Sequence, residues 1–196
     1  MERTLTVLGC DGSYPGPGGA ASGYLVRSGA TTLWLDAGPG TFAALQLHCA
    51  PSDLDAVVLS HEHSDHWTDL ESLGAWLVCR GGGRVPVYAP AGLAGRSSFA
   101  SHRVFAWEVI EPGQELAIGE LACRFSATDH GPTTLATRLD TPEGPAGLVY
   151  SADTGAERLI TTHRWPTVSA QVLADEAGAA FGAAVAQAAP GLTFEW

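Results

Sequence analysis

Short apolar stretches separated by glycine-rich turns fill the first third of the chain. The alternating and β-branched residues of these stretches are typical of strands. Four strands are predicted there, at Thr4–Gly9, Tyr24–Arg27, Thr31–Asp36 and Asp55–Ser60. The turn Ser28-Gly29-Ala30 predicts that the second and third strands form a hairpin, and Phe42–Cys49 has the apolar spacing of a helix.

A further helix is predicted just after residue 66, because Thr68 and Glu71 have the spacing of a capping box. The apolar stripe that follows them consists of Leu70, Leu73, Trp76 and Leu77. Later apolar runs predict strands at Val85–Tyr88, Val104–Ile110, Leu121–Ser126, Leu135–Leu139, Leu148–Ser151, Leu159–Thr162 and Leu192–Glu195, and a helix over Ser169–Phe181. The whole pattern predicts one domain, residues 1–196, of the α/β (α+β) class, with two sheets and helices on their outer faces.

Composition narrows the function classes. The 196 residues carry 21 acidic side chains against 10 basic ones, a net charge of −11. Proteins that bind nucleic acid rely on basic side chains to neutralise phosphates, so a small-molecule substrate is expected and nucleic acid is disfavoured.

The N-terminus shows no signal peptide and no apolar stretch is long enough to span a membrane, which predicts a cytoplasmic protein. The four cysteines form no C-x-x-C pair and are interpreted as small buried apolar residues.

The strongest chemical signal is Ser60-His61-Glu62-His63-Ser64-Asp65-His66, at the end of a predicted buried strand. Imidazoles are strong ligands for zinc and related divalent ions, and carboxylates add compensating charge. In extended backbone, His61 and His63 point to the same side of the chain, and the following turn can bring Asp65 and His66 beside a second ion. Three histidines and an aspartate within six residues seldom serve core packing, so this segment predicts metal binding.

This segment resembles the H-x-H-x-D-H signature of the metallo-β-lactamase superfamily, and Leu35-Asp36-Ala37-Gly38 resembles an opening element of that family. The run from Asp53 to His61 is similar to the branch that contains ribonuclease Z and cyclic phosphodiesterases. The resemblance implies a four-layer αββα sandwich with the metals at one edge of the sheets. It also implies that Asp36 is a buried carboxylate supporting the histidine-rich loop.

The same resemblance implies three further ligands: His130, Asp153 and His163. One ion would be held by His61, His63 and His130, and the other by Asp65, His66 and His163, with Asp153 shared. His48 and His102 match nothing in the family.

The implied chemistry is metal-assisted hydrolysis of a small ester, thioester or phosphodiester, with Asp65, His66 and Asp153 as the catalytic side chains. No serine or cysteine nucleophile is required. Two divalent ions are expected, zinc first, with manganese and iron as alternatives.

The sequence departs from the family after Asp153, because only nine residues separate it from His163 where relatives carry a helix, a strand and a second helix. The C-terminal half is therefore predicted to be shortened. A hairpin of that length would carry His163 away from Asp153, so whether it reaches the metals is left open. The shortening is also expected to expose a sheet edge, which predicts a homodimer.

Three alternatives remain beside the leading hypothesis. One is a degenerate family member that binds metal without catalysis. Another is a ribonuclease Z-like RNA phosphodiesterase, although the long RNA-gripping arm and the additional Glu and His of that group are not found. The third is β-lactam hydrolysis, which is the weakest because the signature follows the fold and not the substrate.

Overall fold

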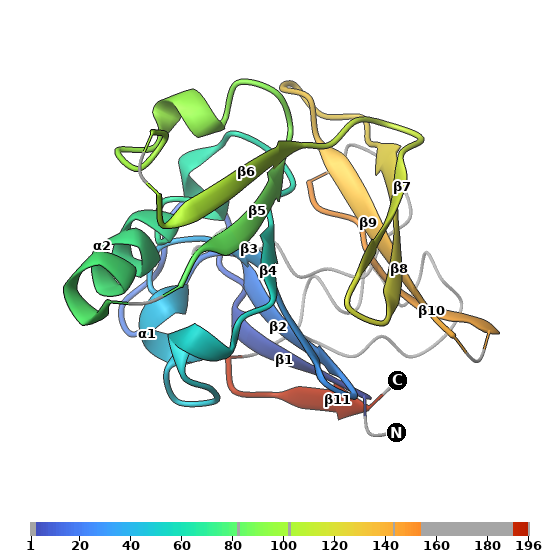
Figure 1. Cartoon of the computed structure of the whole chain (residues 1–196), viewed down its shortest axis with the longest axis horizontal. Coiled ribbons are helices and arrows are strands. Elements are labelled where there is room, and N and C mark those ends of the chain that lie inside the picture. The colour runs from blue at the N-terminus through green and yellow to red at the C-terminus, as the bar shows by residue number, and fades with distance from the viewer. Residues whose placement is uncertain (1–2, 82, 102, 143, 154–189, 196) are drawn as a thin grey trace.

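Two sheets face each other in the computed structural model, which describes residues 3–81, 83–101, 103–142, 144–153 and 190–195 (Figure 1). The first sheet has seven strands, in the order β11 (Thr193–Glu195), β1 (Arg3–Gly9), β2 (Gly23–Ser28), β3 (Thr31–Ala37), β4 (Ala56–Val58), β5 (Val85–Ala89) and β6 (Phe105–Val109). The second sheet has four, in the order β10 (Gly144–Tyr150), β9 (Leu135–Thr141), β8 (Leu121–Ala127) and β7 (Glu115–Ile118).

Strand direction differs between the sheets. In the first sheet β1 pairs antiparallel with both β11 and β2, and β2 pairs antiparallel with β3. From β3 to β6 the strands are parallel, so the carboxyl ends of β3, β4 and β5 meet at one edge. The second sheet is antiparallel throughout, which makes β8 and β10 run in the same direction on either side of β9.

The helices cover the outer face of the first sheet (Figure 1). They are α1 (Thr41–Leu45) and α2 (Leu70–Arg80), with short 3-10 turns η1 (Pro51–Asp53), η2 (Ser64–His66) and η3 (Ala94–Arg96). The inner side of α2 buries Leu70, Leu73 and Leu77, which are the apolar positions that the sequence pattern selects. None of the helices in the described part of the chain is long and apolar enough to cross a membrane.

The first sheet separates two apolar cores because its side chains alternate between faces. In β3, Trp34 packs toward the helices, whereas Leu33 and Leu35 pack toward the second sheet. In β4, Val57 faces the helices while its neighbours face the second sheet. The central strands β3 and β4 are therefore buried on both faces, which explains why their sequences are nearly continuous apolar runs.

Most of the predicted elements within the described residues are found. They include the predicted hairpin, in which β2 pairs antiparallel with β3 and Ser28 is the partner of Thr31. Strand β7 was not predicted, since its four residues lie between two glycines and offer little alternation. The first helix is shorter than predicted and ends at Leu45. The predicted helix over 169–181 and the predicted strand over 159–162 lie outside the described residues.

The predicted capping box at Thr68 is wrong. Helix α2 begins at Leu70 after Asp69, and no side chain caps its first turn. The Thr68 hydroxyl donates to the Ser64 carbonyl at 2.9 Å, and the Glu71 carboxylate accepts hydrogen bonds from the Ser97 hydroxyl and the Ser98 amide. Asp69 accepts a hydrogen bond from the Phe42 amide at 2.8 Å, which ties the start of α1 to the start of α2.

Thiol reactivity offers a test of this fold. Cys79 is exposed on α2, whereas Cys10 and Cys123 are buried, and burial raises the pKa of the Cys123 thiol to about 12. Because the thiolate is the reactive form, we expect an aromatic disulfide reagent at mildly alkaline pH to modify Cys79 quickly and Cys123 only after denaturation. The half-buried Cys49, whose pKa burial also raises, should react slowly. Equally fast reaction of all four cysteines in the native protein would contradict this packing.

Candidate metal centre

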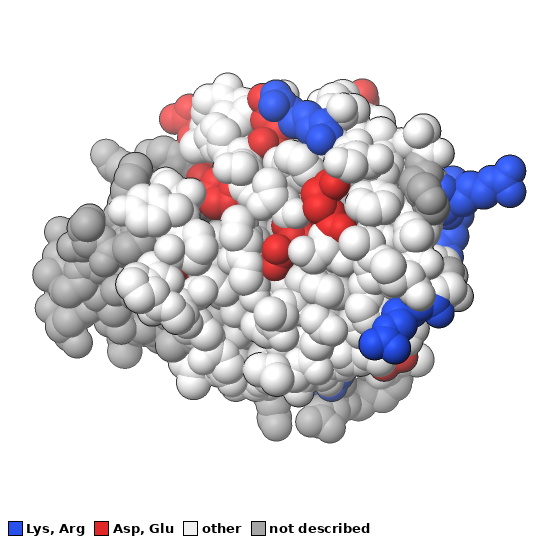
Figure 2. All heavy atoms as spheres, turned by 90° about the vertical axis from the view of Figure 1, so that its left-hand side faces the viewer, with Lys and Arg blue, Asp and Glu red and all other residues white. Residues whose placement is uncertain are grey.

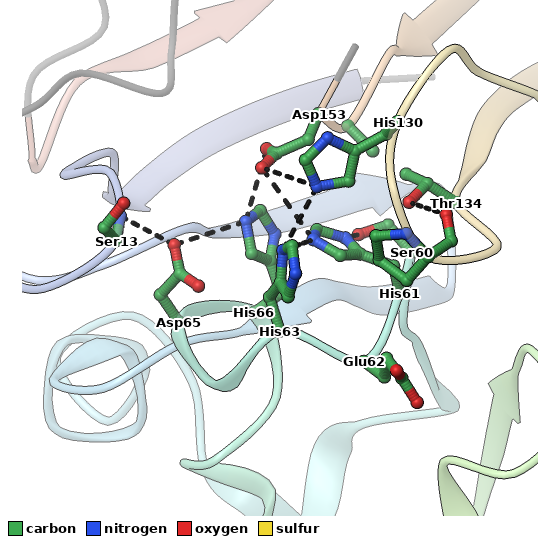
Figure 3. Close-up of polar contacts among 12 residues, drawn as sticks. Ser13, Ser60, His61, Glu62, His63, Asp65, His66, His130, Thr134 and Asp153 are labelled. Atoms are coloured by element: carbon green, nitrogen blue, oxygen red, sulfur yellow. Dashed lines mark hydrogen bonds and ion pairs between the residues drawn. The ribbon is translucent and has the colours of Figure 1, made fainter.

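The histidines and aspartates of the candidate site gather where strands of both sheets end. His61 and His63 follow β4 within five residues, and η2 carries Asp65 and His66. The second sheet contributes His130, from the loop between β8 and β9, and Asp153, three residues after β10. The segments that follow β4, β8 and β10 thus bring together six side chains that are separated by up to 92 positions in the sequence (Figure 3).

The first set of ligand atoms comes from His61, His63, His130 and Asp153. One ligand atom from each of these residues lies within 4.8 Å of all the others. The Nδ1 atom of His63 is 3.0 Å from Nε2 of His61 and 3.1 Å from Nε2 of His130. The Oδ2 atom of Asp153 is 3.8 Å from Nε2 of His61 and 3.6 Å from Nε2 of His130.

A second set of ligand atoms adjoins the first and shares Asp153 with it. The Nε2 atom of His66 is 3.3 Å from Oδ1 of Asp153 and 3.6 Å from Oδ2 of Asp65. The two carboxylate oxygens of Asp153 therefore face different groups, Oδ2 toward His61 and His130 and Oδ1 toward His66 (Figure 3).

The Asp36 carboxylate, at the end of β3, fixes the orientation of this cluster from behind. It is fully buried. Its Oδ1 accepts the amide of Ser60 at 2.7 Å. Its Oδ2 accepts the Ser60 hydroxyl at 2.7 Å, Nδ1–H of His66 at 2.6 Å and the Tyr150 hydroxyl at 2.6 Å. Since Tyr150 belongs to β10, this carboxylate joins the two sheets at the site.

These hydrogen bonds determine which nitrogen of each ring can serve as a ligand. The Ser60 hydroxyl donates its hydrogen to Asp36, so at its 2.9 Å contact with Nδ1 of His61 it accepts. His61 and His66 consequently both carry their hydrogen on Nδ1, and Nε2 of each faces the cluster. Hydrogen-bonded support of this kind is what holds metal-binding histidines in one tautomer.

Burial and neighbouring charges shift the pKa values of the two buried histidines, His61 and His66, in opposite directions. Burial lowers the pKa of His61 to about 4, with the nearby His66 adding to the effect, so His61 is neutral at neutral pH. Burial also disfavours the charged form of His66, but the Asp36 charge and the hydrogen bonds to Asp153 and Asp36 outweigh it and raise the pKa of His66 to about 10. An ion that binds Nε2 of His66 therefore has to displace a proton.

The Asp36 and Tyr150 pair keeps its donor and acceptor roles over the neutral range. Burial alone would raise the pKa of the Asp36 carboxyl, but the charge and hydrogen bond of His66 hold it below its ordinary value. Burial, together with the Asp36 charge, raises the pKa of the Tyr150 hydroxyl well above its ordinary value. Tyr150 is thus a donor and Asp36 an acceptor wherever the protein is folded near neutral pH.

Strained backbone surrounds the cluster. The non-glycine residues with positive φ in the described part of the chain are Ser13 (61°), Asp36 (53°) and Ala152 (56°). The amide of Ser13 donates to Oδ2 of Asp65 at 2.7 Å, and Ala152 directly precedes Asp153. Left-handed conformations cost free energy in residues with a Cβ atom, and such residues concentrate where a site dictates the path of the chain.

Glu62, the middle residue of the His-Glu-His segment, is turned away from the cluster (Figure 3). Its carboxylate accepts two hydrogen bonds from Arg96, at 2.6 and 3.0 Å, and its carbonyl accepts the Trp67 indole N–H at 3.2 Å. Glu62 therefore stabilises the loop and is not among the groups that face the cluster.

The residues present fit a divalent metal ion. Ligand atoms placed tetrahedrally at the usual Zn–N distance of about 2.0–2.1 Å lie roughly 3.3 Å from one another. The nitrogen–nitrogen distances of 3.0 and 3.1 Å and the nitrogen–oxygen distances of 3.6 and 3.8 Å lie on either side of that spacing. Imidazole nitrogens with carboxylate oxygens are also a donor set that zinc, manganese and iron accept.

The structure brings together six of the seven residues nominated from the sequence, namely His61, His63, Asp65, His66, His130 and Asp153. His163 and His102 lie outside the described residues. His48 lies in the turn after α1, away from the site. The sequence analysis did not predict the contacts of Ser13, Ser60 and Tyr150, since no local pattern signals contacts with partners as much as 114 positions away.

This fold and site define the class of protein as one of the metallo-β-lactamase fold. Residues 31–169 match the family described as Beta-lactamase superfamily domain, and the chain belongs to that family. The Bacillus subtilis protein named probable metallo-hydrolase YhfI is 31% identical over 156 residues, and the match covers 76% of this chain and 63% of YhfI. The crystal structure of YhfI aligns over 100% of both chains with a TM-score of 0.87 and 25% identity.

Two other relatives are similar in sequence. Protein Rv1339 of Mycobacterium tuberculosis is 36% identical over 168 residues, covering 77% of this chain and 60% of the relative. Ribonuclease Z of Methanopyrus kandleri is 33% identical over 149 residues, covering 74% of this chain and 53% of the relative. The matched part of this chain thus spans between 53% and 63% of the length of these curated relatives.

Substitution of Asp36 by Asn tests the supporting role of this carboxylate. The variant keeps the shape of the side chain but removes the charge that faces His66. We expect zinc affinity to fall by about 10- to 100-fold, as for other partners of metal ligands, and the free energy of unfolding to fall by about 3 kcal/mol. Chelator competition and chemical denaturation measure the two effects.

The matched control for this experiment is Asp55→Asn. Asp55 is exposed and accepts a single amide hydrogen bond from Thr32, outside the site. Its substitution should leave zinc affinity unchanged and cost less than about 1 kcal/mol of stability. If both variants bind zinc as the unmodified protein does, Asp36 does not support the metal centre.

Proposed function

We propose that this chain is a hydrolase that uses two divalent metal ions to cleave a small ester, thioester or phosphodiester. The observation that carries the proposal is the placement of Asp153, whose Oδ2 faces ring nitrogens of His61 and His130 and whose Oδ1 faces that of His66, at 3.3–3.8 Å. A carboxylate so placed can serve two ions at once. Membership of the β-lactamase superfamily and similarity to a protein named probable metallo-hydrolase support the same proposal.

The residues of the chain divide between the two ions. His61, His63 and His130 would hold one, Asp65 and His66 the other, and Asp153 both. Ions in such a pair supply a water molecule of lowered pKa and positive charge that stabilises a developing oxyanion.

The Asp65 carboxylate, held by the amide of Ser13, would orient the attacking water and accept its proton. The support that Asp36 gives to His66 would keep the opposite wall of the site fixed while that proton moves.

Zinc is the ion that we propose first, because neutral imidazoles and carboxylates are its usual nitrogen and oxygen ligands. Manganese and iron accept the same donors and are the alternatives. His163 remains a candidate for the remaining position on the second ion, and it lies outside the described residues.

The charge of the protein favours a small substrate over RNA. The net charge is −11, and on the face that carries α1 and α2 the basic side chains of the described residues lie apart from one another among acidic and uncharged ones (Figure 2). Proteins that grip RNA need clustered basic side chains. Cleavage of RNA is nonetheless the second candidate function, because one relative is named ribonuclease Z.

The metal content of the purified chain is the first prediction of this proposal. We expect elemental analysis after incubation with zinc to give about two ions per chain, since two sets of ligands share Asp153. The variant Asp65→Ala removes a ligand of the second set only, and should retain about one ion. A ratio of one or zero for the unmodified chain would show that the second set does not bind and would favour a degenerate family member.

Activity is the second prediction. We expect the zinc- or manganese-loaded protein to hydrolyse bis-p-nitrophenyl phosphate or a member of an ester and thioester panel. The variant His63→Ala should lose more than about 100-fold in rate, because His63 contacts two other proposed ligands and even supporting residues contribute about 10- to 100-fold.

The control variant for activity is His48→Ala, which removes a histidine outside the site and should retain full activity. Inactivity of the two-metal protein toward the whole panel would contradict the small-substrate proposal. Cleavage of a precursor transfer RNA with no activity on the panel would favour RNA as the substrate.

A further inference from the structure

The two strands of the second sheet that deliver ligands to the site are not neighbours. Strand β9 lies between β8, which leads to His130, and β10, which leads to Asp153. Strands in a sheet are about 4.8 Å apart, so the ends of β8 and β10 are separated by about 10 Å. The segments that follow the two strands nevertheless bring these side chains together, since Nε2 of His130 lies 3.6 Å from Oδ2 of Asp153 (Figure 3).

Thr128, the first residue after β8, connects these two segments directly. Its hydroxyl donates a hydrogen bond of 2.7 Å to the main-chain carbonyl of Asp153. Its own carbonyl accepts the amide of His130 at 3.1 Å, and its amide donates to the carbonyl of Thr134 at 3.1 Å. One residue thus contacts the backbone of both proposed ligands of the second sheet.

The segment that Thr128 holds is under conformational strain. Ala152, which precedes Asp153, has a φ of 56°, and this left-handed conformation is unfavourable for a residue with a Cβ atom. Such a conformation persists only where surrounding contacts enforce it. The Thr128 hydroxyl acts on the carbonyl of the next residue, where a small rotation of the backbone would swing the Asp153 carboxylate out of reach of the rings.

We propose that Thr128 is a positioning residue that sets the separation of His130 and Asp153, and through it the affinity of the site for divalent ions. The inference rests on the proposed metal-dependent function. Replacing Thr128 by Val exchanges the hydroxyl for a methyl group of similar size, so it removes the hydrogen bond to Asp153 and leaves the main-chain contacts of residue 128 in place.

The same loop provides a matched control. The Thr134 hydroxyl also donates to a main-chain carbonyl, that of Pro132 at 3.0 Å, but this bond stays within the loop and does not reach Asp153. If the role of Thr128 were only to keep the loop folded, Thr134→Val should have a comparable effect. If its role is to anchor Asp153, only Thr128→Val should weaken metal binding.

The experiment measures zinc affinity by competition with a chromophoric chelator, and the visible absorption spectrum of the cobalt-loaded protein, for the unmodified chain and three variants. We expect Thr128→Val to bind zinc about 10-fold more weakly and to shift the cobalt bands, because the ligand geometry changes. Thr128→Ser, which keeps the hydroxyl, and Thr134→Val should both match the unmodified chain. Thr128→Ala, which lacks the hydroxyl and the methyl group, replaces Thr128→Val if that variant does not fold.

The outcomes separate the inference from the proposal on which it rests. Zinc affinity and cobalt bands of Thr128→Val equal to those of the unmodified chain would overturn the role of Thr128 while leaving the metal site standing. An equal loss in Thr128→Val and Thr134→Val would overturn it too, since the loop as a whole would then be responsible. Failure of the unmodified chain to bind zinc would instead remove the proposed function, and the inference with it.

Discussion

The Asp36 carboxylate accepts hydrogen bonds from a loop of the first sheet, from η2 and from a strand of the second sheet, and the geometry of the candidate site depends on these bonds. A carboxylate buried without partners would be costly, so the fold must supply its donors. By supplying them it also orients His66 directly and His61 through Ser60. Building the core and orienting the ligands are therefore the same event in this chain.

The two sheets make different contributions to the site. In the first sheet, parallel strands buried on both faces present His61 to His66 in one short segment, supported from within the core. In the second sheet, antiparallel strands bring His130 and Asp153 from loops that leave non-adjacent strands. The ligands from the second sheet are held by contacts between loops, such as that of Thr128 with Asp153, whereas the ligands from the first sheet are held by buried strands.

Much of this could be predicted from sequence, for physical reasons. Burial on both faces requires continuous apolar runs, which is why β3 and β4 could be predicted from the sequence. The histidine-rich segment indicates a metal site by itself, because it places three histidines and an aspartate within six residues. The capping box at Thr68 failed because Glu71 serves Ser97 and Ser98 from another loop, a tertiary contact that no local pattern carries. The contacts of Tyr150 and Ser13 are invisible for the same reason, since their partners lie 114 and 52 positions away.

The shared position of Asp153 has a consequence for the chain as a polymer. The cysteines that the structure describes are all free, so no covalent bridge there ties the first sheet to the second. An ion held by His61 and Asp153 would close a loop of 92 positions. Such a closure restricts the unfolded chain much as a disulfide of equal span does, and the restriction grows with the length of the loop. The metal ion proposed for catalysis would therefore also stabilise the fold, by linking the first sheet to the second.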